Sequence, residues 1–245
     1  MMGRSHAVSG AVVWLAGCAT ASALGADPAA ATIVVGAVTT AGAALLPDID
    51  HPGSTVARSL GPLTRLVAYG TSAGATLLRD ATCGCCTRKG GHRAITHTLA
   101  FAVAAGLLVS LLGWAVGRTA ALIVVGAMAA LSVRCMFRRR SRGAFGAFGA
   151  GLVAAAAAAF LPGPAGWWWI GVPVGLGCLI HTGGDALTFS RVPLLWPLRL
   201  RGCRWAPVGM WSPLRFRTGS GVELWLVVPA MLAAGALSVY VLGLR

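Results

Sequence analysis

Long stretches without a charged side chain are the feature that most constrains how this chain of 245 residues can fold. A helix needs about 20 apolar residues to cross the hydrocarbon core of a bilayer. Uncharged runs that approach or exceed this length cover residues 5–26, 28–47, 94–117, 119–133, 143–184 and 224–244. Pro162-Gly163-Pro164 divides the longest run, because proline cannot continue a helix. The sequence therefore predicts an all-α transmembrane bundle of about six to seven helices.

Two basic segments lie between the apolar runs. Residues 52–93 mix arginines with short apolar pieces, which predicts a cytoplasmic or interfacial excursion. Residues 191–217 combine Arg, Trp and Pro, as expected of a basic interfacial loop, and residues 222–244 form the final predicted span. We expect the whole chain, residues 1–245, to form a single membrane-embedded domain.

Composition excludes other classes of protein. Only 11% of the residues are charged and 57% are hydrophobic, whereas soluble domains carry about a quarter charged residues and disordered chains have low hydrophobicity. The net charge of +14 can signal nucleic-acid binding, but long uncharged runs separate the basic residues, so we expect no nucleic-acid partner. With seven spans, 18 of the 20 Lys and Arg fall on one side, which the positive-inside rule assigns to the cytoplasm.

The N-terminus allows a competing interpretation. Leu15-Ala16-Gly17-Cys18 looks like a bacterial lipobox, and Ala21-Ser22-Ala23 resembles a signal-peptidase site. Either cleavage would remove His6 from the mature protein. The basic segment before the apolar run is a single arginine, so we expect the run to be retained as a first transmembrane helix.

The rare polar residues collect at one membrane face. All five histidines and three of the six acids map to the cytoplasmic ends of the predicted spans. His181 and Asp185 share a helix face, and ionisable groups in a span are costly unless paired or ligated. Residues 47–52 form an acid-rich turn held by two prolines, which limit its backbone. These patterns predict a metal site with the candidate ligands His6, Asp48, Asp50, His51, His92, His97, His181 and Asp185.

Each pattern also has a purely structural interpretation. A single histidine at an interface can be a polar anchor, and the 47–52 segment can be a solvated turn. His181 and Asp185 can form a hydrogen-bonded pair that joins helices. His92 and His97 do not share a helical face unless His92 precedes the helix, whose N-terminus Thr96 could cap.

Three motifs resemble those of the YdjM-like inner-membrane metal-dependent hydrolases. They are Pro47-Asp48-Ile49-Asp50-His51-Pro52, then His92-Arg93-Ala94-Ile95-Thr96-His97-Thr98, then Asp185-Ala186-Leu187-Thr188 running into Pro193-Leu194-Leu195-Trp196-Pro197. His6 with Gly10 fits the N-terminal motif of the family, so the resemblance covers His6 to Pro197. Ala94, Thr98 and Arg191 depart from the common residues, and the Cys-containing segment 79–91 is not typical of the family.

The resemblance implies a protein of the bacterial inner membrane that is distantly similar to the zinc phospholipase C and P1 nuclease superfamily, whose members hydrolyse phosphoesters. We therefore expect a hydrolase with two or three divalent ions, with zinc favoured by the imidazole content. Metal-activated water would attack phosphorus, with Asp50 and His92 as catalytic candidates and Arg93 binding the phosphate. Membrane lipids are the expected partners, and a phospholipid or polyprenyl phosphate is the expected substrate.

Two other classes of function remain open on sequence. A metal transporter would place its polar site near the bilayer midplane, whereas most of these ligands map to the ends of helices. A non-enzymatic protein could bind metal, or anionic lipid through residues 191–217. Cys83, Cys85 and Cys86 contain one C-x-x-C, which only Cys135 or a histidine could complete as a zinc site. Free thiols or a redox-sensitive loop are the alternative.

Overall fold

The computed structural model describes residues 1–59, 61–83, 93–137, 143–161 and 166–243. The described part is helical, with isolated β-bridges between residues 188 and 216 in place of a sheet, so the predicted all-α class is confirmed. Its α-helices are α1 (Gly3–Ala23), α2 (Ala30–Ala43), α3 (Pro62–Thr82), α4 (Leu99–Ala115), α5 (Arg118–Met136), α6 (Gly143–Phe160), α7 (Gly171–Ala186) and α8 (Val228–Gly243). Shorter turns are η1 (Leu46–Asp50), η2 (Ile95–His97), η3 (Trp168–Ile170), η4 (Ser212–Leu214) and the π-helical η5 (Glu223–Val227).

Four described helical segments are long and apolar enough to cross a membrane. They are Gly3–Ala23, Ala30–Asp50, Arg118–Met136 and Glu223–Gly243, which correspond to α1, α2 with η1, α5, and η5 with α8. The prediction of transmembrane helices is therefore confirmed. Two further apolar helices, Leu99–Ala115 and Gly146–Phe160, are shorter than these.

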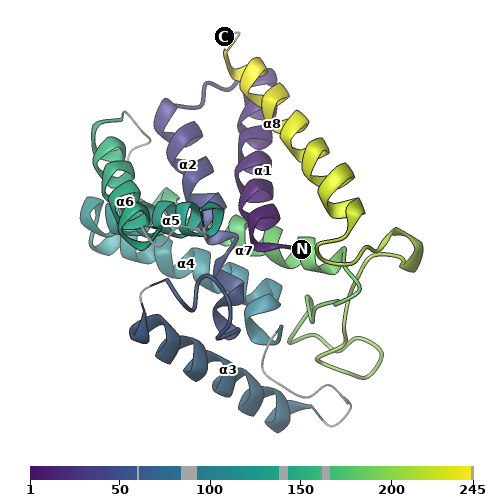
Figure 1. Cartoon of the computed structure of the whole chain (residues 1–245). Helices are drawn as coiled ribbons and strands as arrows, with labels where there is room; N and C mark the ends of the chain where they lie inside the picture. The colour runs from purple at the N-terminus through teal and green to yellow at the C-terminus, as the bar shows by residue number, and fades with distance from the viewer. Residues whose placement is uncertain (60, 84–92, 138–142, 162–165, 244–245) are drawn as a thin grey trace.

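The helices do not form a simple parallel bundle. α1 packs between α2 and α8, and these three helices rise together in Figure 1, whereas α4 and α7 run crosswise to them. α2 also contacts α5 and α7, and α5 packs against α6. α2 is therefore the central helix, and its end is where the two sets of helices meet.

Two glycines bring α1 and α7 close to α2. A Cβ atom at Gly10 of α1 would lie 2.6 Å from the carbonyl oxygen of Thr40, and a Cβ at Gly177 of α7 would lie 2.6 Å from the same oxygen. Only glycine permits such an approach without a backbone shift, as expected for helices that pack through small residues. His6 and His181 each lie four residues, about one turn, from one of these glycines. The two crossings thereby bring both histidines to the end of α2.

The predicted excursion at 52–93 contains helix α3, which lies at the lower edge of the molecule in Figure 1. α3 contacts η1. Its Ala75 packs in a small cluster with Ala94 and Trp205, so this helix joins the turn before η2 to the 191–217 loop. α3 therefore packs against η1, which contains Asp48, and against Ala94, three residues before His97.

Candidate metal centre

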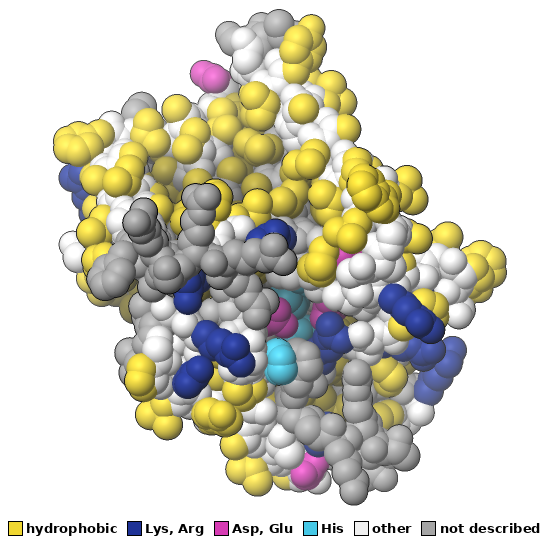
Figure 2. Space-filling model, viewed as in Figure 1, with side chains coloured by type: hydrophobic (Ala, Val, Ile, Leu, Met, Phe, Trp, Pro, Cys, Tyr) yellow, Lys and Arg dark blue, Asp and Glu magenta, His cyan; other side chains and the backbone are white. Residues whose placement is uncertain are grey.

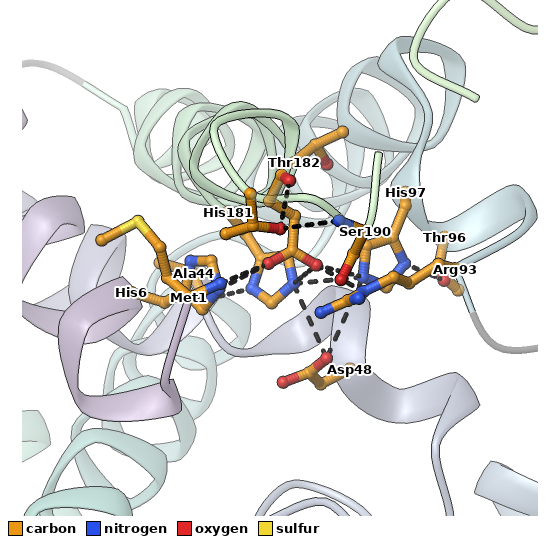
Figure 3. Close-up of polar contacts among 12 residues, drawn as sticks. Met1, His6, Ala44, Asp48, Arg93, Thr96, His97, His181, Thr182 and Ser190 are labelled. Carbon is orange, nitrogen blue, oxygen red and sulfur yellow. Dashed lines mark hydrogen bonds and ion pairs between the residues drawn. The ribbon is translucent and has the colours of Figure 1, made fainter. Parts of the chain in front are cut away.

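Histidine and acidic side chains from α1, η1, η2 and α7 meet at the end of α2 (Figure 3). In the space-filling view, histidine and acidic side chains are visible in a depression that basic side chains flank, and apolar side chains cover the molecule above it (Figure 2). His97 and His181 are fully buried, and Asp185 is 1% exposed. The side chain of Asp48 is 27% exposed, so this carboxylate lies on the open side of the cluster.

Four side-chain atoms converge at the centre of this cluster. Nε2 of His97 lies 3.1 Å from Nε2 of His181. Oδ1 of Asp48 lies 3.6 Å from the His181 nitrogen and 3.9 Å from the His97 nitrogen. Oδ2 of Asp185 lies 3.7 Å from the His97 nitrogen and 4.0 Å from the His181 nitrogen. An oxygen of Asp48 and an oxygen of Asp185 thus each lie within 4.0 Å of the same pair of imidazole nitrogens.

The outer ring nitrogen of each histidine contacts a partner that orients the ring. Nδ1 of His181 lies 2.8 Å from the carbonyl oxygen of Ala44, so it donates its proton there. Nδ1 of His97 lies 3.0 Å from the Thr96 hydroxyl, which itself donates to Oδ2 of Asp50 at 2.7 Å. The hydroxyl must therefore accept from His97. In a neutral ring both arrangements place the proton on Nδ1, which makes Nε2 the nitrogen that can bind a metal ion.

His6 contacts the outer oxygen of Asp185. Its Nε2 lies 3.2 Å from Oδ1 of Asp185, and its ring stacks on that of His181 with 3.8 Å between the centroids. The N-terminal amine of Met1 also lies 2.6 Å from Oδ1 of Asp185. His6, His181 and Asp185 form one possible metal-binding group, and Asp48, His97 and His181 form a second. The two groups share His181.

Cationic neighbours keep Asp185 ionised. Burial raises the pKa of Asp185, but the His6 hydrogen bond and the nearby positive charges outweigh it and hold this pKa well below its ordinary value. Nε of Arg93 also lies 2.6 Å from Oδ2 of Asp185. A carboxylate with a lowered pKa is charged at neutral pH, so Asp185 provides an anionic ligand.

Arg93 is held by two acids at once. Its backbone has a φ of 57°, which L-residues rarely adopt, and its N–H donates to Oδ2 of Asp50 at 2.9 Å. Its guanidinium meets Asp185. Strained backbone of this kind persists where the surrounding contacts enforce it, and such residues concentrate at functional sites.

The structure brings together five of the eight predicted ligands, namely His6, Asp48, His97, His181 and Asp185. Asp50 is fully buried behind His97 and belongs to neither group. His51 is exposed and is also outside both groups. His92 lies outside the described residues. The expectation that Thr96 caps the next helix is wrong, because Thr98 caps α4 by accepting from the Phe101 N–H at 3.1 Å.

Sequence reasoning missed Glu223 and the contacts of the cysteines. Glu223 is fully buried and accepts from the backbone N–H groups of Met2 and Gly219, both at 2.7 Å. Sγ of Cys83 lies 3.9 Å from Sγ of Cys203, whereas Cys135 packs in a separate cluster with Ala7, Leu45 and Val56. The structure therefore does not bring Cys135 to Cys83, as completion of a zinc site by Cys135 would require. Cys85 and Cys86 lie outside the described residues.

The family model of the YdjM inner membrane protein matches residues 1–243. The chain belongs to the YdjM inner membrane protein family. The match extends beyond the motifs that carry the resemblance and includes α8, so the family model covers all of the described helices. No curated protein and no solved structure matches the chain. Family membership and the apolar helices together assign the protein to the inner membrane.

Proposed function

We propose that this protein is a membrane-bound metal-dependent hydrolase that cleaves a phosphoester at the cluster around His181. The observation that carries the proposal is the convergence of Nε2 of His97, Nε2 of His181, Oδ1 of Asp48 and Oδ2 of Asp185. Two imidazoles and two carboxylates are a donor set that suits a divalent ion, with zinc expected from the imidazole content.

The spacing of these atoms fits one ion. Zinc binds nitrogen and oxygen at 2.0–2.1 Å, so neighbouring ligand atoms of a tetrahedral site lie about 3.4 Å apart. The three separations within the group of Asp48, His97 and His181 run from 3.1 to 3.9 Å, and these three ligands leave a fourth position for water. His181 has one ring nitrogen available, since the other donates to Ala44. Both possible metal-binding groups therefore need the same atom, Nε2 of His181. This favours a single ion over the two or three that the sequence suggests.

The remaining polar residues then act by holding the ligands. His6 orients Asp185 through Oδ1, and Asp50 orients His97 through the Thr96 hydroxyl. Such outer contacts fix ring orientation and raise ligand basicity. Because Asp50 is fully buried and Oδ2 already accepts two hydrogen bonds, we assign it to positioning His97 rather than to orienting the reacting water.

The charge of the site suits an anionic ester. A divalent ion bound there would activate water and polarise a phosphoryl oxygen. Two carboxylate ligands offset the charge of such an ion, and Arg93 adds one positive charge beside Asp185. The guanidinium of Arg93 is the group that binds the phosphoryl oxygens. In the reaction, water adds to phosphorus, the ester P–O bond breaks, and the alcohol leaves with a proton. The membrane location favours a lipid phosphoester as substrate.

Metal analysis of protein purified without chelators tests the proposal. Wild type should carry about one equivalent of zinc or another divalent ion, since the two possible groups of three ligands share His181 and three protein ligands leave the fourth position of the ion to water. His181→Ala and Asp185→Asn should lose it. His51→Ala is the matched control and should retain it, because His51 is exposed and outside both groups.

Hydrolysis is measured with the same proteins, using bis(4-nitrophenyl) phosphate and vesicles that contain phosphatidic acid. Release of nitrophenol or phosphate by wild type and His51→Ala, but not by His181→Ala, would support the proposal. A wild type without metal would overturn it. A metal-loaded wild type that cleaves neither probe would instead indicate a non-enzymatic metal-binding membrane protein.

A further inference from the structure

The segment between α7 and α8 is basic and lies at the end of the molecule where α8 begins (Figure 1). No acidic residue and no lysine occurs between Asp185 and Glu223. The charged residues of this stretch are Arg191, Arg199, Arg201, Arg204, Arg215 and Arg217. A guanidinium group can bind two phosphate oxygens at once, whereas the ammonium group of lysine acts as a point charge. The segment is therefore suited to an anionic partner that carries phosphate.

Residues 192–208 of this segment fold back on themselves as a hairpin. Val192 pairs with Val208, and Leu200 and Cys203 exchange two backbone hydrogen bonds at the tip. The two residues between them, Arg201 and Gly202, have φ values of 52° and 81°. A two-residue turn of this kind normally begins with Asn, Asp or Gly, because other side chains are strained at a positive φ. Strained residues concentrate at functional sites, so the arginine at the tip is itself a sign of function.

The base of the hairpin is fixed and its tip is cationic. Trp205 is 5% exposed, packs against α3 and donates from Nε1 to the hydroxyl of Thr82 at 2.9 Å. At the tip, Arg199, Arg201 and Arg204 are exposed. Within the part of the chain that the structure describes, none of these three arginines forms an ion pair. The fold thus holds the hairpin in place and leaves three guanidinium groups for a partner outside the chain.

Large apolar side chains are exposed among these arginines. Leu198 is 66% exposed beside Arg199, and Trp211 and Leu214 are 72% and 61% exposed further along the segment. Basic and hydrophobic side chains lie side by side at this edge of the molecule in the space-filling view (Figure 2). Contact with a soluble polyanion would leave the apolar side chains in water, whereas a bilayer buries them beneath its headgroups.

The segment also leads directly into a membrane span. The span Glu223–Gly243 begins six residues after Arg217. Six residues reach about 20 Å when fully extended, so the end of the segment stays close to the headgroups. Basic residues at this distance are attracted to anionic lipids. Charge, exposed apolar surface and connection to a span therefore point to the same partner.

We propose that residues 191–217 form a binding site for anionic phospholipid. The guanidinium groups of Arg199, Arg201 and Arg204 bind the phosphate of the headgroup, and Leu198 contacts the lipid chains. The occupant is thus a lipid of the same membrane. This inference does not depend on the proposed hydrolase activity, because the three arginines belong to neither possible metal-binding group.

Native mass spectrometry of the detergent-purified protein tests the site. The probes are phosphatidylglycerol and phosphatidylcholine with the same acyl chains. Wild type should bind the first phosphatidylglycerol more tightly than the first phosphatidylcholine. The triple variant Arg199→Gln, Arg201→Gln, Arg204→Gln should lose this preference, with an affinity for phosphatidylglycerol that falls about fivefold for each arginine removed.

A second triple variant is the matched control for net charge. Arg58→Gln, Arg65→Gln, Arg118→Gln removes three exposed arginines from other parts of the chain. It should bind phosphatidylglycerol as wild type does. Unchanged thermal unfolding of both variants would show that the fold is retained. Equal weakening in the two triple variants, or a wild type without preference for phosphatidylglycerol, would overturn the proposal.

Arg201→Asn separates lipid binding from a structural role of the turn. Asparagine before glycine is the favoured pair for this turn, so the temperature of unfolding should rise. The affinity for phosphatidylglycerol should fall about fivefold at the same time, because one guanidinium group is lost. A variant that is more stable and binds phosphatidylglycerol as tightly as wild type would contradict the assignment of the tip to the headgroup.

Leu198→Ser distinguishes membrane lipid from a soluble polyanion, since it keeps every arginine. It should weaken the binding of phosphatidylglycerol, because the lipid chains bury Leu198. A single-stranded oligonucleotide is the competing probe and should not bind to the hairpin tip. Binding of the oligonucleotide that the Arg199, Arg201, Arg204 variant abolishes, with unchanged lipid affinity in Leu198→Ser, would assign the tip to nucleic acid and overturn the proposal.

Discussion

At the scale of single residues, Thr96 shows how a buried hydroxyl can set the chemistry of a neighbouring imidazole. It donates to Asp50 and so must accept from Nδ1 of His97. These two hydrogen bonds favour the His97 tautomer with its proton on Nδ1, and its Nε2 faces Nε2 of His181. The same carboxylate holds the N–H of Arg93, so Asp50 links the strained backbone to the orientation of the ring.

Replacement of Thr96 by valine should therefore weaken metal binding without abolishing it. The variant keeps the ring of His97 but removes the acceptor that orients it, and loss of such outer contacts typically costs about 10- to 100-fold in metal affinity. Competition with a fluorescent zinc chelator measures the affinity.

Thr182→Val is the matched control for this prediction. Thr182 is fully buried one residue after His181, but its hydroxyl donates to the carbonyl of Cys178 within α7. Its loss should leave zinc affinity close to wild type. Equal losses in Thr96→Val and Thr182→Val would show that the effect of Thr96 is general destabilisation rather than orientation of His97.

The sequence indicates some of these residues better than others. The spacing of His181 and Asp185 follows from helical periodicity, and the acidic turn at 47–52 is bounded by two prolines. No periodicity indicates that Asp50 lies behind His97, because that contact depends on the 3-10 turn η1 and on the positive φ of Arg93. For the same reason, the sequence does not indicate that Asp48 belongs to a possible metal-binding group and that His51 does not.

At the scale of elements, the carbonyl of Thr40 is the point where α1, α2 and α7 are closest. The abundance of glycine in the sequence predicts close helix contacts, and Gly10 and Gly177 make them. The sequence does not indicate which of the 34 glycines face another helix. Which glycines do so depends on where along their length the helices cross. The apolar faces of α1, α2 and α7 are too similar to specify these points.

Gly177→Ala should destabilise the protein and reduce its metal content. The new methyl group would meet the Thr40 carbonyl and the Cβ of Ala43 at 2.6 and 2.7 Å, so α7 must shift. Overpacking of this kind costs about 1–3 kcal/mol, and the shift would move His181, one turn further along α7. Thermal unfolding and metal analysis in the same detergent measure both effects.

Gly17→Ala provides the comparison for that variant. Gly17 lies in α1 with open space at its Cβ, so alanine there should gain the helix propensity that glycine lacks and raise stability by up to about 1 kcal/mol. A Gly177→Ala protein as stable as Gly17→Ala, with full metal content, would contradict the close packing of α7 on α2.

At the scale of the whole molecule, contacts between distant segments restrict how often the chain crosses the membrane. The N–H of Met2 donates to Glu223, so α1 and the segment η5 with α8 begin side by side. α1 leads away from this end, and α2 returns to it. The return is shown by Asp48, just after α2, whose carboxylate lies 3.6 Å from His181. His97 before α4 and Asp185 at the end of α7 also lie at this end. The helices from α4 to α7 must therefore cross an even number of times.

The even number of membrane crossings from α4 to α7 restricts which helices span the membrane more than helix length alone does. Between His97 and Asp185, α5 is the described helix that is long and apolar enough to span by itself. If α5 crosses, at least one shorter helix must also cross, and α6, which packs against α5, is the natural partner. The sequence predicts individual spans, but their pairing depends on contacts between residues more than a hundred positions apart.

The C-terminus should therefore lie on the opposite side of the membrane from the metal centre. The total number of crossings is odd, because α1 and α2 make two, α4 to α7 make an even number, and α8 adds one. The positive-inside rule predicts that the candidate metal centre faces the cytoplasm. A C-terminal fusion after Arg245 should give active alkaline phosphatase and dark green fluorescent protein, whereas the fluorescent protein inserted in the loop after Arg201 should be bright. Bright fluorescence both at the C-terminus and after Arg201 would require an even number of crossings and would contradict the side-by-side start of α1 and of the segment η5 with α8.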